Sequence, residues 1–183
     1  RSGQAAANLL ARCGKSVLIS DVRGEEELAD MLAGLDERVE WVCGKNVFGD
    51  AQVIGVSPGL RPGLPLFREA AHRGIPVISE VELAFEVSRA PWLGITGTDG
   101  KTTTTSLVGA MLSAAGIEHV VGGNIGTALC EIVEEVSEEG VIVAELSAAL
   151  DINRGEIAAH LQQMYDYMQT RLVEGNVRKD ATP

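Results

Sequence analysis

Short apolar runs alternate with segments of helical length along the first 147 residues of this 183-residue chain. Several of the runs end in Gly, Ser, Asp or Pro, which are residues that terminate strands. Such an alternation favours a parallel sheet, because two parallel strands are joined by a crossover that usually contains a helix. The sequence therefore predicts an α/β fold with strands at seven runs, residues 17–19, 39–42, 52–56, 76–78, 92–95, 119–121 and 141–143.

The spacing of these runs restarts near residues 90 and 91, after a helical-looking segment at residues 80–88. We therefore expect two successive α/β units. The remaining residues, 148–183, differ in character, because apolar side chains there recur at helical spacing and predict an amphipathic helix at about residues 155–174. This apolar face needs a covering surface. Either the sheet covers it, or a partner protein does. The face comprises Ile157, Leu161, Met164, Met168 and Leu172.

Charge and cysteine content exclude several classes of protein. The chain has 15 Lys and Arg against 26 Asp and Glu, a net charge of −11, which argues against a general nucleic-acid or anionic-membrane surface. Its three cysteines form no CxxC pair, so neither a disulfide framework nor a structural zinc site is expected. We therefore expect a reducing, cytoplasmic location. No apolar run approaches the roughly 18 residues of a membrane span.

The strongest chemical signal is at residues 93–104, where an apolar strand leads into a glycine-rich turn, a Lys-Thr pair and an amphipathic helix. Glycines in the turn allow backbone N–H groups to face phosphate oxygens, and the helix N-terminus adds its positive dipole end. Lys101 would pair with the β- and γ-phosphates of a nucleotide, and the Thr102 hydroxyl could ligate Mg²⁺. The predicted phosphate site comprises Gly97, Thr98, Asp99, Gly100, Lys101, Thr102 and Thr103.

This loop departs from a strict Walker A pattern, which has a glycine where this chain has Ile95. The alternative is an ordinary glycine-rich turn between a strand and a helix. Glu145 ends the predicted strand at residues 141–143 and is a candidate Mg²⁺ partner, because P-loop enzymes place an acid at the end of a neighbouring parallel strand. The alternative for Glu145 is a solvated acid at a strand end.

Weaker signals lie nearer the N-terminus. Arg1-Ser2-Gly3 precedes a helix-forming run and is similar to the end of a dinucleotide-type glycine turn. Asp21 follows about 20 residues later, where an acid often holds a ribose or a base. Residues 57–59 (Ser-Pro-Gly) follow another predicted strand, and a plain turn is the alternative there.

The histidines and the acidic run near residue 135 are expected at the surface. None of the three histidines has ligand spacing or a paired nucleophile, so His72, His119 and His160 are expected at the surface or its boundary. The acidic run at residues 131–139 is expected to form a solvated helix face, with its apolar side at Ile132, Val133 and Val136.

Six motifs occur in an order that resembles the Mur ligases of peptidoglycan synthesis. The typical loop of that family, TG-x-(N/D)-GK-(S/T), accounts for the misfit to Walker A. The match is closest to the branch of the family that joins D-glutamate to UDP-N-acetylmuramoyl-L-alanine. The six motifs are RSG at 1–3, DVR at 21–23, SPG at 57–59, TGTDGKT at 96–102, GGNIG at 122–126 and ELS at 145–147.

This resemblance implies a role for each matching residue. Lys101 and Thr102 would hold ATP and Mg²⁺, Glu145 would be a magnesium ligand, and Lys101 and Glu145 would be the catalytic pair. ATP would phosphorylate a carboxylate of the substrate, and the amine of D-glutamate would attack the acyl phosphate. The UDP part of the substrate would lie along Ser2, Asp21, Arg23 and Gly59, with Asn124 near the muramoyl–alanine end.

The same resemblance implies a Rossmann-like parallel-sheet unit at residues 1–89, which would bind the UDP-substrate, and an incomplete P-loop ATPase α/β unit at residues 90–147. The family has a first strand and leading glycines before the RSG motif. After the ELS motif it continues with the rest of the ATPase domain and a third domain. We therefore expect a chain truncated at both ends that binds a nucleotide and does not complete ligation.

Residues 150–183 resemble a different family, the flagellin export chaperones, small helical bundles that wrap the C-terminal segment of flagellin. One helix cannot form a bundle core, so chaperone activity from this tail alone is not expected. The two resemblances share no biology, so we expect a chimeric or mis-joined chain with a seam near residues 147–150, and flagellin as a partner only if this tail is functional. The alternative function is a helical interaction module carried on an α/β domain. The resemblance rests on Leu150-Asp151, residues 154–158, Leu161, residues 165–168, Arg171-Leu172 and Asp180.

Overall fold

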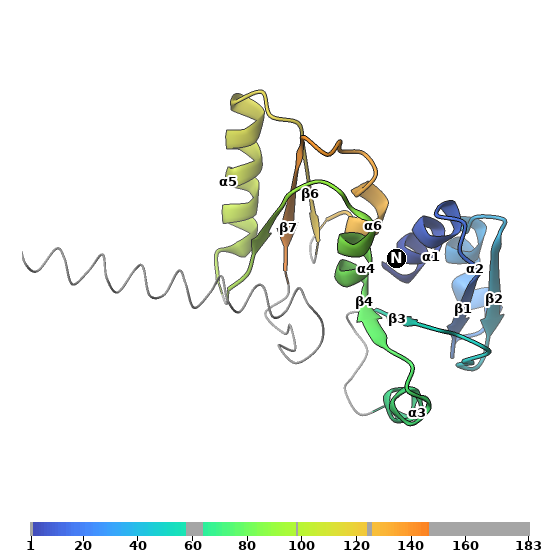
Figure 1. Cartoon of the computed structure of the whole chain (residues 1–183). Helices are drawn as coiled ribbons and strands as arrows, with labels where there is room; N and C mark the ends of the chain where they lie inside the picture. The colour runs from blue at the N-terminus through green and yellow to red at the C-terminus, as the bar shows by residue number, and fades with distance from the viewer. Residues whose placement is uncertain (1, 58–63, 98, 124–125, 147–183) are drawn as a thin grey trace, which may run out of the picture. The chain divides into compact units, whose positions relative to one another are not determined.

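The computed structural model describes residues 2–57, 64–97, 99–123 and 126–146 (Figure 1). The chain divides into two units, residues 1–146 and 147–183, and every described residue belongs to the first. The predicted tail helix and the predicted seam therefore lie outside the described residues. Within the described ranges, no helix combines the length and the apolar character needed to cross a membrane.

Helices and parallel strands alternate along the described residues, which confirms the predicted α/β class. Each of the seven predicted runs forms a strand, and every strand pair is parallel. The elements are α1 (Ser2–Arg12), β1 (Val17–Asp21), α2 (Glu25–Ala33), β2 (Val39–Cys43), β3 (Ile54–Val56), α3 (Pro65–Arg73), β4 (Val77–Ser79), α4 (Glu80–Val87), β5 (Trp92–Ile95), α5 (Lys101–Ala114), β6 (His119–Gly123), α6 (Leu129–Ile132) and β7 (Val141–Glu145).

The first four strands form two sheets, whereas the family resemblance of the motifs implies one Rossmann-like sheet. β1 pairs with β2, and β3 pairs with β4. In the doubly wound strand order 3-2-1-4-5, the strand that precedes the first helix lies between strands 2 and 4. The boundary between the two sheets falls at that position. Among the described residues α1 comes before every strand, so none of them fills the position between the two pairs.

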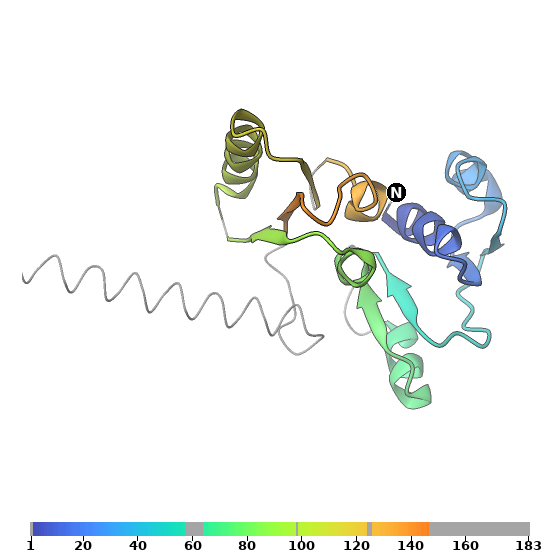
Figure 2. The same cartoon turned by 45° about the horizontal axis from the view of Figure 1, so that its top comes forward.

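Helix α1 packs against elements from both halves of the described chain. It contacts β1, β2 and β3 as well as α4 and α6, and Figure 2 shows it beside α6. Ala7 and Ala11, four residues apart on one face of the helix, are buried against Val39 of β2. Leu9 is fully buried. The helix is therefore held by buried apolar side chains, and the small ones at Ala7 and Ala11 let it approach β2 closely.

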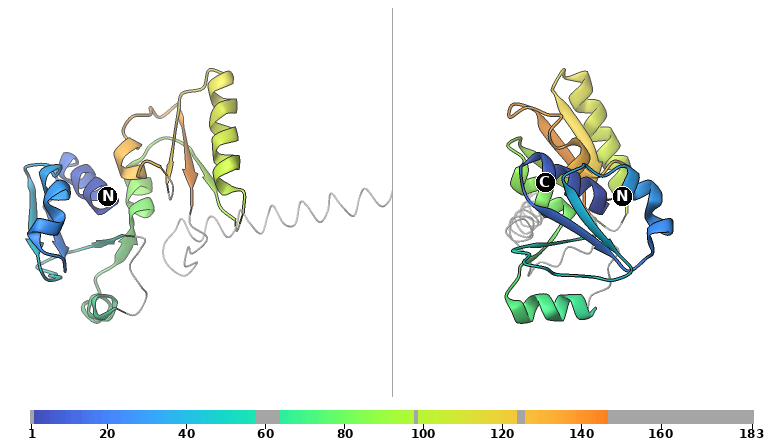
Figure 3. Two further views of the ribbon diagram at one scale, coloured as in Figure 1. Left: turned by 180° about the vertical axis from the view of Figure 1, so that it is seen from behind. Right: turned by 90° about the vertical axis from the view of Figure 1, so that its right-hand side faces the viewer.

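The third sheet has the order β5-β7-β6 and is covered on both faces. A Cβ on Gly109 of α5 would meet Val121, and one on Gly122 would meet Ile132 of α6. Val121 and Gly122 point to opposite faces because they are successive strand residues, so α5 and α6 cover opposite faces (Figure 3). The central strand β7 is accordingly a continuous apolar run with residues 142–144 fully buried.

The predicted helix over the acidic run is wrong. Helix α6 ends at Ile132, and turns follow it. Glutamates recur four residues apart in this run, and like charges at that spacing destabilise a helix. Ser137 also donates from its backbone N–H to the Glu118 carboxylate, 3.0 Å away. The burial pattern matches the prediction, because Ile132 and Val133 are buried while the glutamates are exposed.

Candidate functional site

The loop between β5 and α5 has the backbone geometry that its glycines suggest. Gly97 has φ of 149° and Gly100 has φ of 74°, both in the region that side-chain-bearing residues rarely adopt. A Cβ on Gly100 would meet nothing within 4 Å, so conformation rather than space requires glycine at this position. Thr98 lies outside the described residues.

Lys101 is the first residue of α5, and its side chain folds back over the loop. The Nζ atom donates a hydrogen bond to the carbonyl oxygen of Gly97 at 2.6 Å. The N-cap of α5 is Gly100, which has no side chain to accept a hydrogen bond from the first turn. The ammonium group and the N–H groups of this 14-residue helix are thus gathered at one end of the loop, which is a favourable environment for an anion.

Thr102 and Glu145 meet although they are 43 residues apart. Strand β7 pairs with β5 so that Glu145 lies opposite Ile95, immediately before the loop. The Thr102 Oγ1 donates to Glu145 Oε1 at 3.3 Å. Glu145 is only 3% exposed, so it is not the solvated strand-end acid of the alternative interpretation. The parallel register therefore brings the predicted acid to the predicted phosphate loop.

The oxygen atoms of Thr102 and Glu145 are of the kind that bind a hard divalent cation. A carboxylate and a hydroxyl are oxygen ligands of the kind that Mg²⁺ takes, and Mg²⁺ usually binds through one or two carboxylates plus phosphates and water. Nowhere in the described ranges do three or more His, Cys, Asp and Glu side chains gather to form a metal site. Thr102 and Glu145 thus fit a metal that is completed by the phosphates of a nucleotide.

The predicted UDP-substrate residues are only partly brought together. Asp21 at the end of β1 accepts from the Arg23 guanidinium, Nε to Oδ1 at 3.1 Å and Nη2 to Oδ2 at 2.8 Å. This hydrogen bonding lowers the pKa of the Asp21 carboxyl below its ordinary value. Ser2 is the first residue of α1, and a Cβ on the neighbouring Gly3 would lie 3.4 Å from Ser57 Oγ. The remaining two, Gly59 and Asn124, lie outside the described residues.

Glu80 and Cys130 form a buried contact between α4 and α6 that the sequence does not predict. Glu80, the first residue of α4, is 5% exposed, and its Oε1 accepts from the Cys130 backbone N–H of α6 at 2.6 Å. The Cys130 thiol donates to the Glu80 carbonyl oxygen at 3.3 Å. Burial raises the pKa of the Glu80 carboxyl. The one local signal near the pair is the Ser79-x-x-Glu82 capping box, which marks the start of α4 but not its contact with Cys130.

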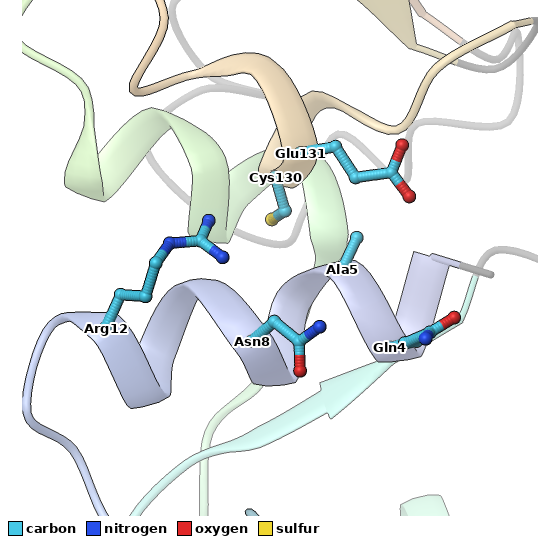
Figure 4. Close-up of a pocket in the computed structure, with 6 residues that line it drawn as sticks. All are labelled: Gln4, Ala5, Asn8, Arg12, Cys130 and Glu131. Atoms are coloured by element: carbon cyan, nitrogen blue, oxygen red, sulfur yellow. The ribbon is translucent and has the colours of Figure 1, made fainter. Parts of the chain in front are cut away.

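Beside this pair lies a pocket of about 170 Å³, away from the β5–α5 loop. Its walls come from α1 and α6, and Figure 4 shows the side chains of one helix facing those of the other. Arg12 of α1 also forms an ion pair with Glu134, Nε to Oε2 at 2.6 Å. Among the described residues, none that lines the pocket belongs to the predicted nucleotide or substrate sites. Its lining is Gln4, Ala5, Asn8, Arg12, Cys130 and Glu131.

Comparison with known proteins gives three kinds of match: a family model, solved structures and curated relatives. The model of the family described as Flagellar protein FliS matches residues 122–183, so the match begins within the β5-β7-β6 sheet, upstream of the predicted seam. The solved structures that match include two ligases, at 22% and 23% identity. A UDP-N-acetylmuramate:L-alanyl-gamma-D-glutamyl-meso-diaminopimelate ligase from Neisseria meningitides has a TM-score of 0.45, with 78% of this chain and 48% of that chain covered. A pseudomurein peptide ligase type C from Methanothermus fervidus has a TM-score of 0.41, with 79% and 30% covered.

Curated relatives match most of the chain at higher identity. A UDP-N-acetylmuramoylalanine–D-glutamate ligase from Streptococcus mutans is 36% identical over 176 residues, covering 94% of this chain and 39% of the relative. The same enzyme from a Geobacter species is 43% identical over 152 residues, covering 81% of this chain and 34% of the relative. The chain therefore spans between one third and two fifths of the length of these relatives. Over that span it is similar to UDP-N-acetylmuramoylalanine–D-glutamate ligases, which confirms the resemblance to the Mur ligases carried by its motifs.

Proposed function

We propose that the chain binds ATP with Mg²⁺ at the β5–α5 loop and is the nucleotide-binding part of a Mur-type amino-acid ligase. The observation that carries this proposal is the contact between Thr102 and Glu145, 3.3 Å from Oγ1 to Oε1, at the loop that holds Lys101. Two motifs that are distant in the sequence meet at the carboxyl edge of a parallel sheet, where ligands of α/β proteins bind.

The residues of the loop have separate roles in this proposal. The backbone N–H groups of the loop would face the phosphates, and the Lys101 ammonium, which donates to the Gly97 carbonyl in the structure, would pair with the β- and γ-phosphates. Thr102 and Glu145 hold Mg²⁺, which when bound offsets the charge of the phosphate oxygens. Lys101 and Glu145 are the catalytic pair, since stabilisation of the transferring phosphoryl group is mainly electrostatic.

The similarity to the curated relatives extends the proposal to substrates. We assign UDP-N-acetylmuramoyl-L-alanine as the acceptor and D-glutamate as the amino acid, joined through an acyl phosphate. In this assignment residues 1–89 form a Rossmann-like unit that carries the UDP contacts, and residues 90–147 form part of the ATP-binding unit. The UDP contacts are Ser2, Asp21, Arg23 and Gly59, with Asn124 near the muramoyl–alanine end. For this chain we propose nucleotide binding without ligation, and D-glutamate-dependent release of ADP by the purified chain would contradict that limit.

Thermal unfolding with and without Mg-ATP tests the proposal. A ligand at 100 times its Kd stabilises a protein by about 2.7 kcal/mol, which is readily measured. We expect this stabilisation in the parent chain, its loss in Lys101→Ala, and its retention in Lys15→Ala, where an exposed lysine between α1 and β1 is removed instead. Stabilisation that survives Lys101→Ala would overturn the assignment of the phosphate site.

A second function is favoured by the FliS match over residues 122–183. In this alternative, the predicted helix at about residues 155–174 binds a partner through its apolar face, and a C-terminal flagellin peptide is the partner to test. Deletion of residues 150–183 should abolish capture of the peptide and leave Mg-ATP stabilisation intact. Absence of capture by the parent chain would exclude this alternative.

A further inference from the structure

We propose that Gly123 is a positioning residue, which fixes the Glu145 carboxylate against Thr102 by allowing strands β6 and β7 to close at their carboxyl ends. This inference rests on the proposed nucleotide site and assigns part of its metal dependence to a residue outside the loop. Gly123 is the last residue of β6 and lies opposite Glu145, the last residue of β7.

The backbone at Gly123 leaves no room for a side chain. Its φ is 127°, in the region that L-residues rarely adopt. A Cβ at this position would overlap the Glu145 carbonyl oxygen and would lie 2.9 Å from the Glu145 backbone nitrogen. Both atoms belong to the backbone, so no rotamer change of a neighbour could relieve the overlap. Any larger residue must therefore separate the two strands at this rung.

Packing on both faces of the sheet limits how far β6 could move out of the sheet plane. On one face, a Cβ on Gly109 of α5 would already come within 2.9 Å of Val121. On the other face, a Cβ on Gly122 would lie 2.6 Å from Ile132 and 2.8 Å from the Thr127 carbonyl oxygen. The Gly123 N–H also donates to that carbonyl at 3.0 Å. Strand β6 is thus confined between two helices, and separation must occur at the edge where Gly123 faces Glu145.

Strand β7 transmits this separation to the site. The Leu146 N–H donates to the Ile95 carbonyl at 2.8 Å, so the end of β7 is fixed on the β5 side and is open to change on the β6 side. Opening that side would admit water to a carboxylate that is now 3% exposed and would alter its approach to Thr102. Residues that orient metal ligands from outside the coordination sphere typically contribute 10–100-fold to metal affinity.

The test compares ATP binding in the presence and absence of Mg²⁺ by isothermal titration of the full chain. For Gly123→Ala we expect the enhancement of ATP affinity by Mg²⁺ to fall about tenfold, with the Mg²⁺-free affinity unchanged. The matched control is Gly140→Ala, at the other end of β7, where a Cβ would overlap Val136 and lie 3.0 Å from the Glu118 carbonyl oxygen. That control should lose stability but keep the full Mg²⁺ enhancement.

The possible outcomes separate this inference from the proposed function. If the parent does not bind Mg-ATP, the proposed function fails, and this inference fails with it. If the parent binds and Gly123→Ala keeps the parent's Mg²⁺ enhancement, only the positioning role is overturned. A variant that is not folded at 25 °C, as judged by the absence of a cooperative unfolding transition, is titrated at 10 °C with trimethylamine oxide, which favours the folded state. Failure to fold there would also overturn the positioning role, because Gly123 would then be required for the fold as a whole.

Discussion

Replacement of the buried Glu80 provides a direct test of how α4 and α6 are held together. The Glu80 carboxylate accepts from the Cys130 N–H at 2.6 Å, and Glu80 is 5% exposed. Glu80→Ala removes the acceptor and leaves a buried N–H group without its partner. Glu80→Gln keeps an acceptor oxygen of nearly the same shape and removes the charge. The pair of variants therefore separates the hydrogen bond from the ionisation.

The size of the first effect follows from the nature of this hydrogen bond. Hydrogen bonds to charged groups contribute about 1.5–3 kcal/mol, and a buried donor left without a partner costs about 1–3 kcal/mol. We therefore expect Glu80→Ala to lower the free energy of unfolding by about 2–3 kcal/mol, a decrease in Tm of roughly 5–10 °C for a chain of this size. The matched control Glu86→Gln, which changes an exposed acid on the same helix, should stay within about 0.5 kcal/mol of the parent.

The second effect depends on pH. Burial raises the pKa of Glu80 above its ordinary value of 4.5, so the folded chain holds this proton more tightly than the unfolded chain does. The corresponding stability is present below pH 4.5 and is lost as the pH rises through the raised pKa. Glu80→Gln has no such loss, so its stability relative to the parent should increase as the pH rises above 4.5.

Urea denaturation monitored by tryptophan fluorescence measures both effects, since Trp92 packs edge-on against Phe85 of α4. Two results would refute the reasoning. One is a Glu80→Ala variant within 0.5 kcal/mol of the parent. The other is a Glu80→Gln variant whose stability relative to the parent decreases as the pH rises.

Three further predictions concern the same unit. Leu129→Ala removes a fully buried side chain and should lower the free energy of unfolding in urea by about 2–5 kcal/mol, whereas Leu107→Ala, at a residue that is 59% exposed, should change it by less than about 0.5 kcal/mol. Burial raises the pKa of the Cys130 thiol, so iodoacetamide followed by peptide mass spectrometry should label the exposed Cys13 in the folded chain and Cys130 only after unfolding. Ser79→Ala removes the N-cap hydrogen bond of α4 and should cost about 1 kcal/mol in the same urea assay.

The strands could be predicted because each is coded locally, as an apolar run bounded by residues that end strands. Their order could not, because the position of β7 between β5 and β6 depends on residues far apart in the chain. Helix α3 was not predicted individually, although Pro65 at its start and Gly74 in the left-handed conformation at its end are typical helix boundaries. The helix predicted over residues 131–139 is wrong because its apolar spacing does not account for the repulsion between the glutamates of that run.

The candidate site shows the same division between local and distant information. The loop glycines and Lys101 could be recognised from their order, and strand ends indicated that Glu145 would lie at the same edge of the sheet. Its burial and its contact with Thr102 depend on β7 being the central strand. The overlap that makes Gly123 necessary is likewise visible only when β6 and β7 are paired.

The acidic character of the chain bears on how a metal would assist nucleotide binding. Residues 1–147 contain 11 basic and 21 acidic side chains, so a polyanion meets a repulsive long-range field. Mg²⁺ would reduce that repulsion by lowering the charge of ATP, and separately through Thr102 and Glu145. Ionic strength distinguishes the two contributions, because salt screens exposed charges beyond about 8 Å and has much less effect on a buried pair. The Mg²⁺ enhancement that persists at high salt is therefore the part assigned to Glu145, and it is the part that Gly123→Ala should reduce about tenfold.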